Sequence, residues 1–256
     1  ERKCKYTSTY GTGELIADAL QKGLKEIYLF IGGSATNDGG IGIAAALGYR
    51  FYDILGNLLS PIGKNLLLID RIDNSQLMFD TQKVKIKVIC DVNNPLFGAN
   101  GAAYVYAPQK GATPIEVAQL DQGLVNLAAK LIAYNFPNII DLPGAGAAGG
   151  VGGGAIAFLE AQLISGIQTF LEITELESLI KDCDLVITGE GKLDAQTVRG
   201  KVISGVCSLA KKYSKPIIAV CGAAEKEVAE KLGLDSGREF TSSLCAKFSR
   251  RCTISS

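Results

Sequence analysis

The chain has 256 residues, 47% of them hydrophobic, and its 26 basic residues equal its 26 acidic ones. Such a chain can bury a sizeable core, and because its charges are balanced and scattered, it lacks a field that would recruit nucleic acid or an anionic membrane. It contains no histidine, which excludes a Ser-His-Asp triad, a histidine-ligated metal and a histidine general base.

The N-terminal part of the chain predicts a helix, a strand and a second helix. Apolar residues at helical spacing over residues 12–26 predict a helix with Thr12 as its N-cap. The stretch EIYLFI (26–31) predicts a buried strand, and the loop IGGSATNDGG (31–40) leads from it into a helix that ends at Gly48. This order of elements is typical of an α/β sheet.

The middle of the chain predicts further strands and two helices. Strand-like segments lie at 51–54, in VKIKVICDV (84–92) and in AAYVYA (102–107). Residues 113–135 predict a long amphipathic helix with Thr113 as N-cap and Pro114 in the first helical position. The tract GAGAAGGVGGG is expected to open another helix, AIAFLEAQLI (155–164).

A strand–helix–strand–helix pattern follows. Its segments are CDLVITG (183–189), VISGVCSLAKKY (202–213), KPIIAVCGA (215–223) and EKEVAEKLG (225–233). This rhythm predicts a parallel sheet, and ligands of such sheets bind beyond the carboxyl ends of the strands. The residues that follow the predicted strands, 32–40, 91–101 and 189–201, are therefore the candidates for a site.

The loop at 31–40 has the composition of an anion-binding turn. Glycines such as Gly33 let backbone N–H groups converge on an anion, while Ser34 and Thr36 can donate hydrogen bonds to phosphate oxygens. The spacing matches neither G-x-x-x-x-G-K-[ST] nor G-x-G-x-x-G. The alternative is equally good: Asn37 or Asp38 caps the following helix, and the glycines only permit the turn.

Asp91 comes directly at the end of the apolar strand segment that begins at residue 84, and Asn93 and Asn94 follow it. An acidic residue at a strand end can hold Mg²⁺ or accept a proton from a substrate hydroxyl, and nearby amides can orient a substrate. For this stretch alone, a solvated Asp beside an Asn-Pro turn is the favoured alternative. Lys110 lies on a short loop before a helix N-terminus in APQKGATP, but taken alone it is a weak signal, because surface lysines are usually just solvated.

The segment TGEGKLDAQTVRGK (188–201) is the densest constellation. It combines carboxylates, cations and polar donors: Glu190, Lys192, Asp194, Gln196, Thr197, Arg199 and Lys201. These are more groups than a turn requires, so we favour a functional role over an Asp194 helix cap beside a solvated basic face. No Walker motif surrounds Lys201, because valine follows it.

Cysteine usage and hydropathy indicate a soluble cytoplasmic protein. The seven cysteines form no C-x-x-C pair, and several lie in apolar runs, so we expect reduced thiols. The chain shows no signal-peptide pattern, and the uncharged run at 142–159 is too rich in glycine and alanine to span a membrane. The partner is expected to be a small molecule.

Several blocks together resemble the bacterial-type (type I) glycerate kinase family in order and spacing. They are TSTYGTGELI, IGGSATNDGGIGIAAALGYRF, CDVNNPLFG, APQKGATP, GAGAAGGVGGG and DLVITGEGKLDAQTVRGK. The resemblance implies an α/β fold of two α/β domains, one inserted into the other. We place the inserted domain at 1–165 and a second domain at 166–256, whose parallel, Rossmann- or flavodoxin-like sheet is incomplete.

The resemblance also implies an activity and roles for residues. It implies transfer of the γ-phosphate of ATP to D-glycerate, giving 2-phosphoglycerate, with Mg²⁺. The glycine-rich loop and residues 189–201 would then face each other across a cleft. Asp91 and Asp194 are the candidates for metal ligand and hydroxyl-activating base, with the two roles open between them. Lys201 or Arg199 would neutralise phosphate charge, and Lys110 or Arg199 would hold the glycerate carboxylate.

The family pattern differs from this chain at both ends. Family members begin with a further strand and loop, and the residues after KLGLD depart from the family pattern, so we expect a chain truncated at both ends. An incomplete sheet would expose a strand edge and apolar surface and favour a homo-oligomer.

Two other functions come from different classes. A non-catalytic fragment would act as a ligand-binding or interaction module. A nucleotide-dependent oxidoreductase ranks lowest, because no G-x-G-x-x-G with a ribose-binding acid follows a predicted strand.

Overall fold

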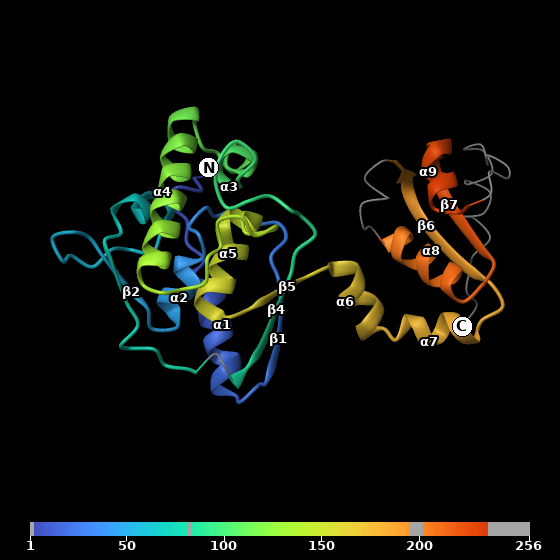
Figure 1. Ribbon diagram of the computed structural model, residues 1–256, viewed down its shortest axis with the longest axis horizontal. Coiled ribbons are helices and arrows are strands. Elements are labelled where there is room, and N and C mark those ends of the chain that lie inside the picture. Colours follow the sequence, from blue (N-terminus) through green and yellow to red (C-terminus); the bar gives the residue numbers. More distant parts are fainter. Residues whose placement is uncertain (1–2, 81–82, 195–201, 235–256) are drawn as a thin grey trace, which may run out of the picture. The chain divides into compact units, whose positions relative to one another are not determined.

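The computed structural model describes residues 3–80, 83–194 and 202–234. It is a mixed α/β structure with parallel sheets, which confirms the predicted fold class, and it divides into two compact units, Glu1–Ile164 and Ser165–Ser256 (Figure 1). The expected domain arrangement, with one domain inserted into the other, stays a prediction. No helix among the described residues has both the length and the hydropathy to cross a bilayer.

The first unit is built on a parallel sheet with the strand order β1–β4–β5. Its strands are β1 (Glu26–Phe30), β4 (Lys85–Ile89) and β5 (Gln162–Ile164). The register pairs Phe30 with Ile89 and Ile89 with Ile164, so the strands end level and the loops that follow them leave the sheet at one edge. This edge carries the glycine-rich loop.

Helices cover one face of this sheet. They are α1 (Tyr10–Gln21), α2 (Ile41–Ala46) and α5 (Ala147–Leu159). Ile16, Leu47 and Val151 of these helices form one buried cluster with Val88 of the sheet. Side chains alternate between the faces of a strand, and Phe30, on the opposite face from Leu29, is 68% exposed. The strand predicted to be buried is therefore half-exposed.

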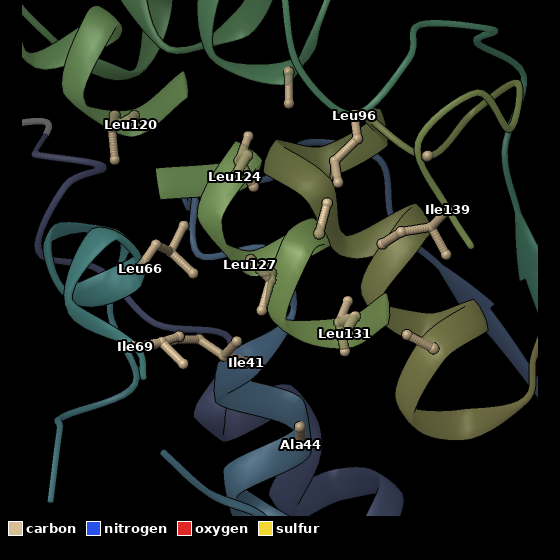
Figure 2. Close-up of a cluster of buried hydrophobic side chains, with 14 of the residues drawn as sticks. Ile41, Ala44, Leu66, Ile69, Leu96, Leu120, Leu124, Leu127, Leu131 and Ile139 are labelled. Carbon is tan, nitrogen blue, oxygen red and sulfur yellow. The ribbon is translucent and has the colours of Figure 1, made fainter. Parts of the chain in front are cut away.

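A second core lies around α4 (Pro114–Ala133). Leu120, Leu124, Leu127 and Leu131 form one stripe of this helix at helical spacing and pack with Leu66 of the 3₁₀ helix η1 (Gly63–Leu68) (Figure 2). The predicted start of α4 is confirmed. The side chains of Thr113 and Glu116 form a reciprocal capping box, and Pro114 stands at the first helical position, where its missing N–H costs nothing.

The remaining elements of the first unit are short. They are the antiparallel pair β2 (Arg50–Tyr52) and β3 (Arg71–Asp73), the helix α3 (Ala102–Tyr106) and the 3₁₀ helix η3 (Pro108–Lys110).

The segment AAYVYA is the helix α3, and its prediction as a strand was wrong. Ala102, Ala103 and Ala107 are buried, whereas Tyr104 and Val105 are exposed, which is a helical and not an alternating pattern. The small alanines let this helix pack closely on α4 and α5. The tyrosines and the valine suggested a strand, but tertiary packing overrode that propensity.

Two predicted helix boundaries also differ. Helix α1 begins at Tyr10 with Thr9, not Thr12, at the N-cap position. Helix α5 ends at Leu159, where Glu160 adopts a left-handed conformation with φ 53°, and the following QLI segment becomes strand β5. Left-handed backbone at a C-cap stops a helix, so the predicted helix does not run on to Ile164.

The second unit contains a parallel pair of strands, as the strand–helix–strand rhythm predicted. Its elements are α6 (Gly166–Ile173), α7 (Leu176–Asp182), β6 (Val186–Leu193), α8 (Val202–Lys212), β7 (Ile217–Ala224) and α9 (Lys226–Lys231). Leu193, Ile203 and Val228 form a buried cluster between the strands and the helices α8 and α9. On the strands, Ile187 and Val220 are 68% and 55% exposed.

Candidate functional site

The glycine-rich loop after β1 rests on a buried lysine. Gly33 adopts a left-handed conformation with φ 70°, which only glycine takes up easily, and Ser34 follows it. Lys110 is 7% exposed, and its Nζ donates hydrogen bonds to Ser34 Oγ (2.7 Å) and to the carbonyl oxygen of Thr36 (2.8 Å). Lys110 is therefore not the solvated surface lysine that its sequence context suggested. Its ammonium group instead fixes the loop through these two hydrogen bonds.

The position of Lys110 comes from the turn that follows α3. Lys110 ends η3, Gly111 turns the chain with φ 89°, and the Lys110 carbonyl accepts a hydrogen bond from the backbone N–H of Cys4 (3.3 Å). Burial lowers the pKa of the Lys110 ammonium below its ordinary value, and the electrostatic influence of Cys4 and Asp38 opposes this.

A pocket of about 170 Å³ adjoins the loop. Five hydroxyl side chains line it: Ser8, Thr9, Thr12, Ser34 and Thr36. The rest of the lining is glycine or apolar, including Leu29, Ile43 and Val151. The hydroxyls at the start of α1 were not predicted as site residues from the sequence. Their signal was the cluster of Thr and Ser in TSTYGT directly before the helix, which contributed only to the family resemblance.

Asp38 is a structural residue of the loop. Its side chain is fully buried, and its carboxylate accepts hydrogen bonds from Thr9 N (2.7 Å), Thr9 Oγ1 (2.8 Å) and Gly40 N (3.1 Å). Burial raises the pKa of the Asp38 carboxyl, and the surrounding donors oppose this. The Asp38 carboxylate thus links Thr9, at the start of α1, to Gly40, the N-cap residue of α2, which gives it a structural role. Its predicted part in phosphate binding stays a prediction.

Replacement of Asp38 by alanine is expected to destabilise the first unit by about 3 kcal/mol, because several buried donors lose their acceptor at once. Asp121→Ala is the matched control. Asp121 is also buried, at 6% exposure, but within the described residues its carboxylate accepts a single hydrogen bond, from Gly98 N, so a loss of about 1 kcal/mol is expected. Urea unfolding followed by tyrosine fluorescence measures both changes. Equal losses of stability for the two variants would contradict this structural role of Asp38.

Polar side-chain atoms without hydrogen-bond partners lie directly before Asp38 in the chain. Thr36 Oγ1 and the amide atoms Oδ1 and Nδ2 of Asn37 are buried, and in the described part of the chain none has a hydrogen-bond partner. Such atoms are rare in folded proteins because each costs free energy, so they point to a ligand or bound water. Thr36 lines the pocket beside Ser34.

The loop after β4 leaves the sheet at the same edge as the glycine-rich loop, because Ile89 and Phe30 pair at the strand ends. The side chain of Asn94 is used within this loop: its Nδ2 donates to the Asn100 carbonyl (2.8 Å), and its Oδ1 accepts from Tyr106 Oη (2.6 Å). Asp91 and Asn93 are exposed. Neither lines the pocket beside Ser34.

In the second unit, the predicted loop begins later than expected. Strand β6 runs to Leu193, so Glu190 lies within the strand, paired with Cys221, and not in a turn. Asp194 follows the strand directly, with its Oδ2 3.8 Å from Lys192 Nζ. The predicted site residues Gln196, Thr197, Arg199 and Lys201 lie outside the described residues.

Asp91 and Asp194 have the chemistry of magnesium ligands. Asp91 is exposed and Asp194 half-buried, so each carboxylate presents the oxygen atoms that Mg²⁺ prefers. Over residues 3–80, 83–194 and 202–234, no three carboxylates or thiols gather at one point.

Comparison with known proteins identifies the family. The profile of the Glycerate kinase family matches residues 1–247. The chain belongs to the glycerate kinase family. This confirms the resemblance on which the six sequence blocks agree, and it gives no support to the interpretation as a non-catalytic fragment.

Individual relatives of this glycerate kinase family chain agree. It is 48% identical to a glycerate kinase of Halalkalibacterium halodurans over 87% of this chain and 59% of the relative. It is 46% identical to the glycerate 2-kinase of Escherichia coli K12 over 87% of this chain and 58% of the relative. A crystal structure assigned as glycerate kinase 2 from Salmonella typhimurium LT2 superposes with a TM-score of 0.80, at 46% identity, over 87% of this chain and 60% of that chain. The chain thus spans about three fifths of the length of these relatives.

Proposed function

We propose that the protein phosphorylates D-glycerate with ATP and releases 2-phosphoglycerate. The observation that carries this proposal is the glycine-rich loop held on the buried Lys110 beside a hydroxyl-lined pocket, in a chain of the glycerate kinase family. The name of the Escherichia coli relative, glycerate 2-kinase, supports the position of the phosphate in the product.

Phosphoryl transfer demands positioning and charge neutralisation more than covalent chemistry, so a protein without histidine can perform it. Ser34 and Thr36 offer hydroxyl donors to an anion. Asp91 and Asp194 are the candidates to accept the proton of the attacking hydroxyl or to hold Mg²⁺, which supplies positive charge to the phosphates of ATP when bound. Arg199 and Lys201 are proposed to neutralise phosphate charge.

The setting proposed for this reaction is the cytoplasm. The described cysteines Cys4, Cys90, Cys183, Cys207 and Cys221 are all free thiols, as expected for a reducing compartment. Its partners are the two small-molecule substrates, and self-association through exposed apolar surface such as Ile187 stays a prediction.

The proposal is tested with the natural full-length protein. We expect ADP release from ATP that depends on D-glycerate, and chelation of divalent cations should abolish it because the triphosphate then loses its neutralising charge. Phosphorus NMR of the product separates 2-phosphoglycerate from 3-phosphoglycerate. Absence of ADP release with D-glycerate would refute the kinase, whereas a 3-phosphoglycerate product would correct only the position of transfer.

A further inference from the structure

We propose that the pocket between the glycine-rich loop and the start of α1 binds the hydroxy acid through its carboxylate, not the nucleotide, and that Lys110 acts as a positioning residue that aims the Ser34 hydroxyl at this carboxylate. The inference rests on the proposed function and names which of the two substrates this pocket takes.

The hydrogen bond from Lys110 fixes the direction of the Ser34 hydroxyl proton. The Lys110 ammonium can only donate, so Ser34 Oγ must accept the 2.7 Å hydrogen bond between them. This orients the Ser34 O–H away from Lys110, and within the described residues the Ser34 hydroxyl donates no hydrogen bond. Its proton is therefore available to an acceptor in the pocket that Ser34 lines. The bond from a cation also strengthens the Ser34 hydroxyl as a donor.

The hydroxyl of Thr36, two residues after Ser34, is a second candidate donor. Thr36 Oγ1 is buried and has no partner among the described residues, although Thr36 lines the same pocket. The Thr36 carbonyl is held by the same ammonium (2.8 Å). Lys110 thus fixes the Ser34 hydroxyl and the Thr36 backbone, and the Thr36 hydroxyl has a proton to donate. A carboxylate has two acceptor oxygens and fits such a pair.

The size and the lining of the pocket favour the hydroxy acid over the nucleotide. A pocket of about 170 Å³ is smaller than the roughly 300–1,000 Å³ of sites for drug-sized ligands, so it suits a three-carbon acid better than a whole nucleotide. No charged side chain of the described residues lines it. A triphosphate carries several charges and requires cations in direct contact.

Another side chain of the pocket lining, Thr9, has the other hydrogen-bonding polarity. Thr9 Oγ1 accepts a hydrogen bond from Ile43 N (3.0 Å) and donates its proton to the buried Asp38 carboxylate (2.8 Å). Thr9 can therefore only accept from a ligand, whereas Ser34 can donate. A molecule that has both a carboxylate and hydroxyl groups matches these two kinds of lining side chain.

The test is direct binding by calorimetry on the natural full-length protein, with D-glycerate and the non-hydrolysable ATP analogue AMP-PNP titrated separately. We expect Ser34→Ala and Lys110→Met each to raise the Kd for D-glycerate about 10-fold, with the Kd for AMP-PNP changed less than about 2-fold. In turnover, the KM for D-glycerate should rise while kcat stays within about 3-fold, because ground-state and transition-state binding are lost together.

Lys130→Met is the matched control. Lys130 is a half-buried lysine of the same unit that pairs with Asp70 (2.7 Å) away from the loop, so its loss should change neither Kd. D-glyceramide, which lacks the negative charge, separates positioning from general structural damage. Because its amide oxygen still accepts a hydrogen bond, the Ser34→Ala and Lys110→Met variants should lose less affinity for it than for D-glycerate. Urea unfolding verifies that both variants are folded. If Lys110→Met is unfolded, Ser34→Ala still tests the inference.

Three outcomes would overturn the assignment: an unchanged Kd for D-glycerate in Ser34→Ala, an equal loss for D-glyceramide, or a loss confined to AMP-PNP. These failures leave the kinase activity of the unchanged protein intact. Failure of the unchanged protein to bind D-glycerate would instead refute the proposed function together with this inference.

Discussion

Gly149→Ala is expected to destabilise the first unit by about 4 kcal/mol. Gly149 has φ 73°, and a Cβ there would lie 2.2 Å from the carbonyl oxygen of Thr36 and 2.7 Å from Asn37 Cα. The left-handed backbone costs an alanine about 1–2 kcal/mol, and the collision with backbone atoms, which cannot rotate away, adds a further cost of about 1–3 kcal/mol. The glycine-rich loop would have to move.

Gly56→Ala is the matched control for this prediction. Gly56 has φ 81°, but a Cβ there meets nothing within 4 Å, so only the conformational cost of about 1–2 kcal/mol remains. Urea unfolding followed by tyrosine fluorescence is well suited to the measurement. The chain has 9 tyrosines and no tryptophan, and Tyr213 alone lies outside the first unit. Equal destabilisation by the two substitutions would contradict the close approach of Gly149 to the loop.

Asp194→Asn is expected to lower kcat about 1,000-fold in the full-length protein. We propose that this carboxylate accepts the proton of the attacking hydroxyl or holds Mg²⁺, and loss of an acid–base group or of a metal ligand has an effect of this order. Folding should remain near normal, because Asp194 is half-buried and its ion pair with Lys192 spans 3.8 Å at the surface. Steady-state kinetics and urea unfolding measure the two effects.

Asp184→Asn provides the comparison in the same unit. Asp184 is exposed and precedes β6, whereas Asp194 follows its carboxyl end, so turnover should stay within about 2-fold of the unchanged protein. Asp91→Asn, measured alongside, separates the two open roles, because loss of a metal ligand should be partly offset by raised Mg²⁺ and loss of a base should not. Unchanged turnover in Asp194→Asn would remove this residue from the site.

Features that depend on neighbouring residues could be predicted well. The start of α4 follows from Thr113, Pro114 and Glu116, because these residues satisfy the first N–H groups of the helix within one turn. The parallel pairing of β6 and β7 follows from apolar strands joined by an amphipathic helix. The family was also predictable, because ordered blocks at set spacing are a property of the sequence itself.

Features that depend on distant residues were ambiguous or wrong. AAYVYA has the composition of a strand, but its alanines face α4 and α5, which no local pattern reveals. Ser8, Thr9 and Thr12 became pocket residues only when α1 packed beside the loop. Residues of the glycine-rich loop were candidates from sequence, but the capping and binding interpretations of the loop could not be separated there.

The sequence by itself determined the α/β class, the family and the loop around which a site is built. The tertiary structure decided how the charged residues near that loop divide their work. Lys110 meets Ser34 across 76 residues and Asp38 meets Thr9 across 29, so Lys110 supports the loop while Asp38 ties the loop to the start of α1. Burial and hydrogen-bond partners decide whether a charge binds a ligand or holds the fold, and both are set by contacts between residues far apart in the chain.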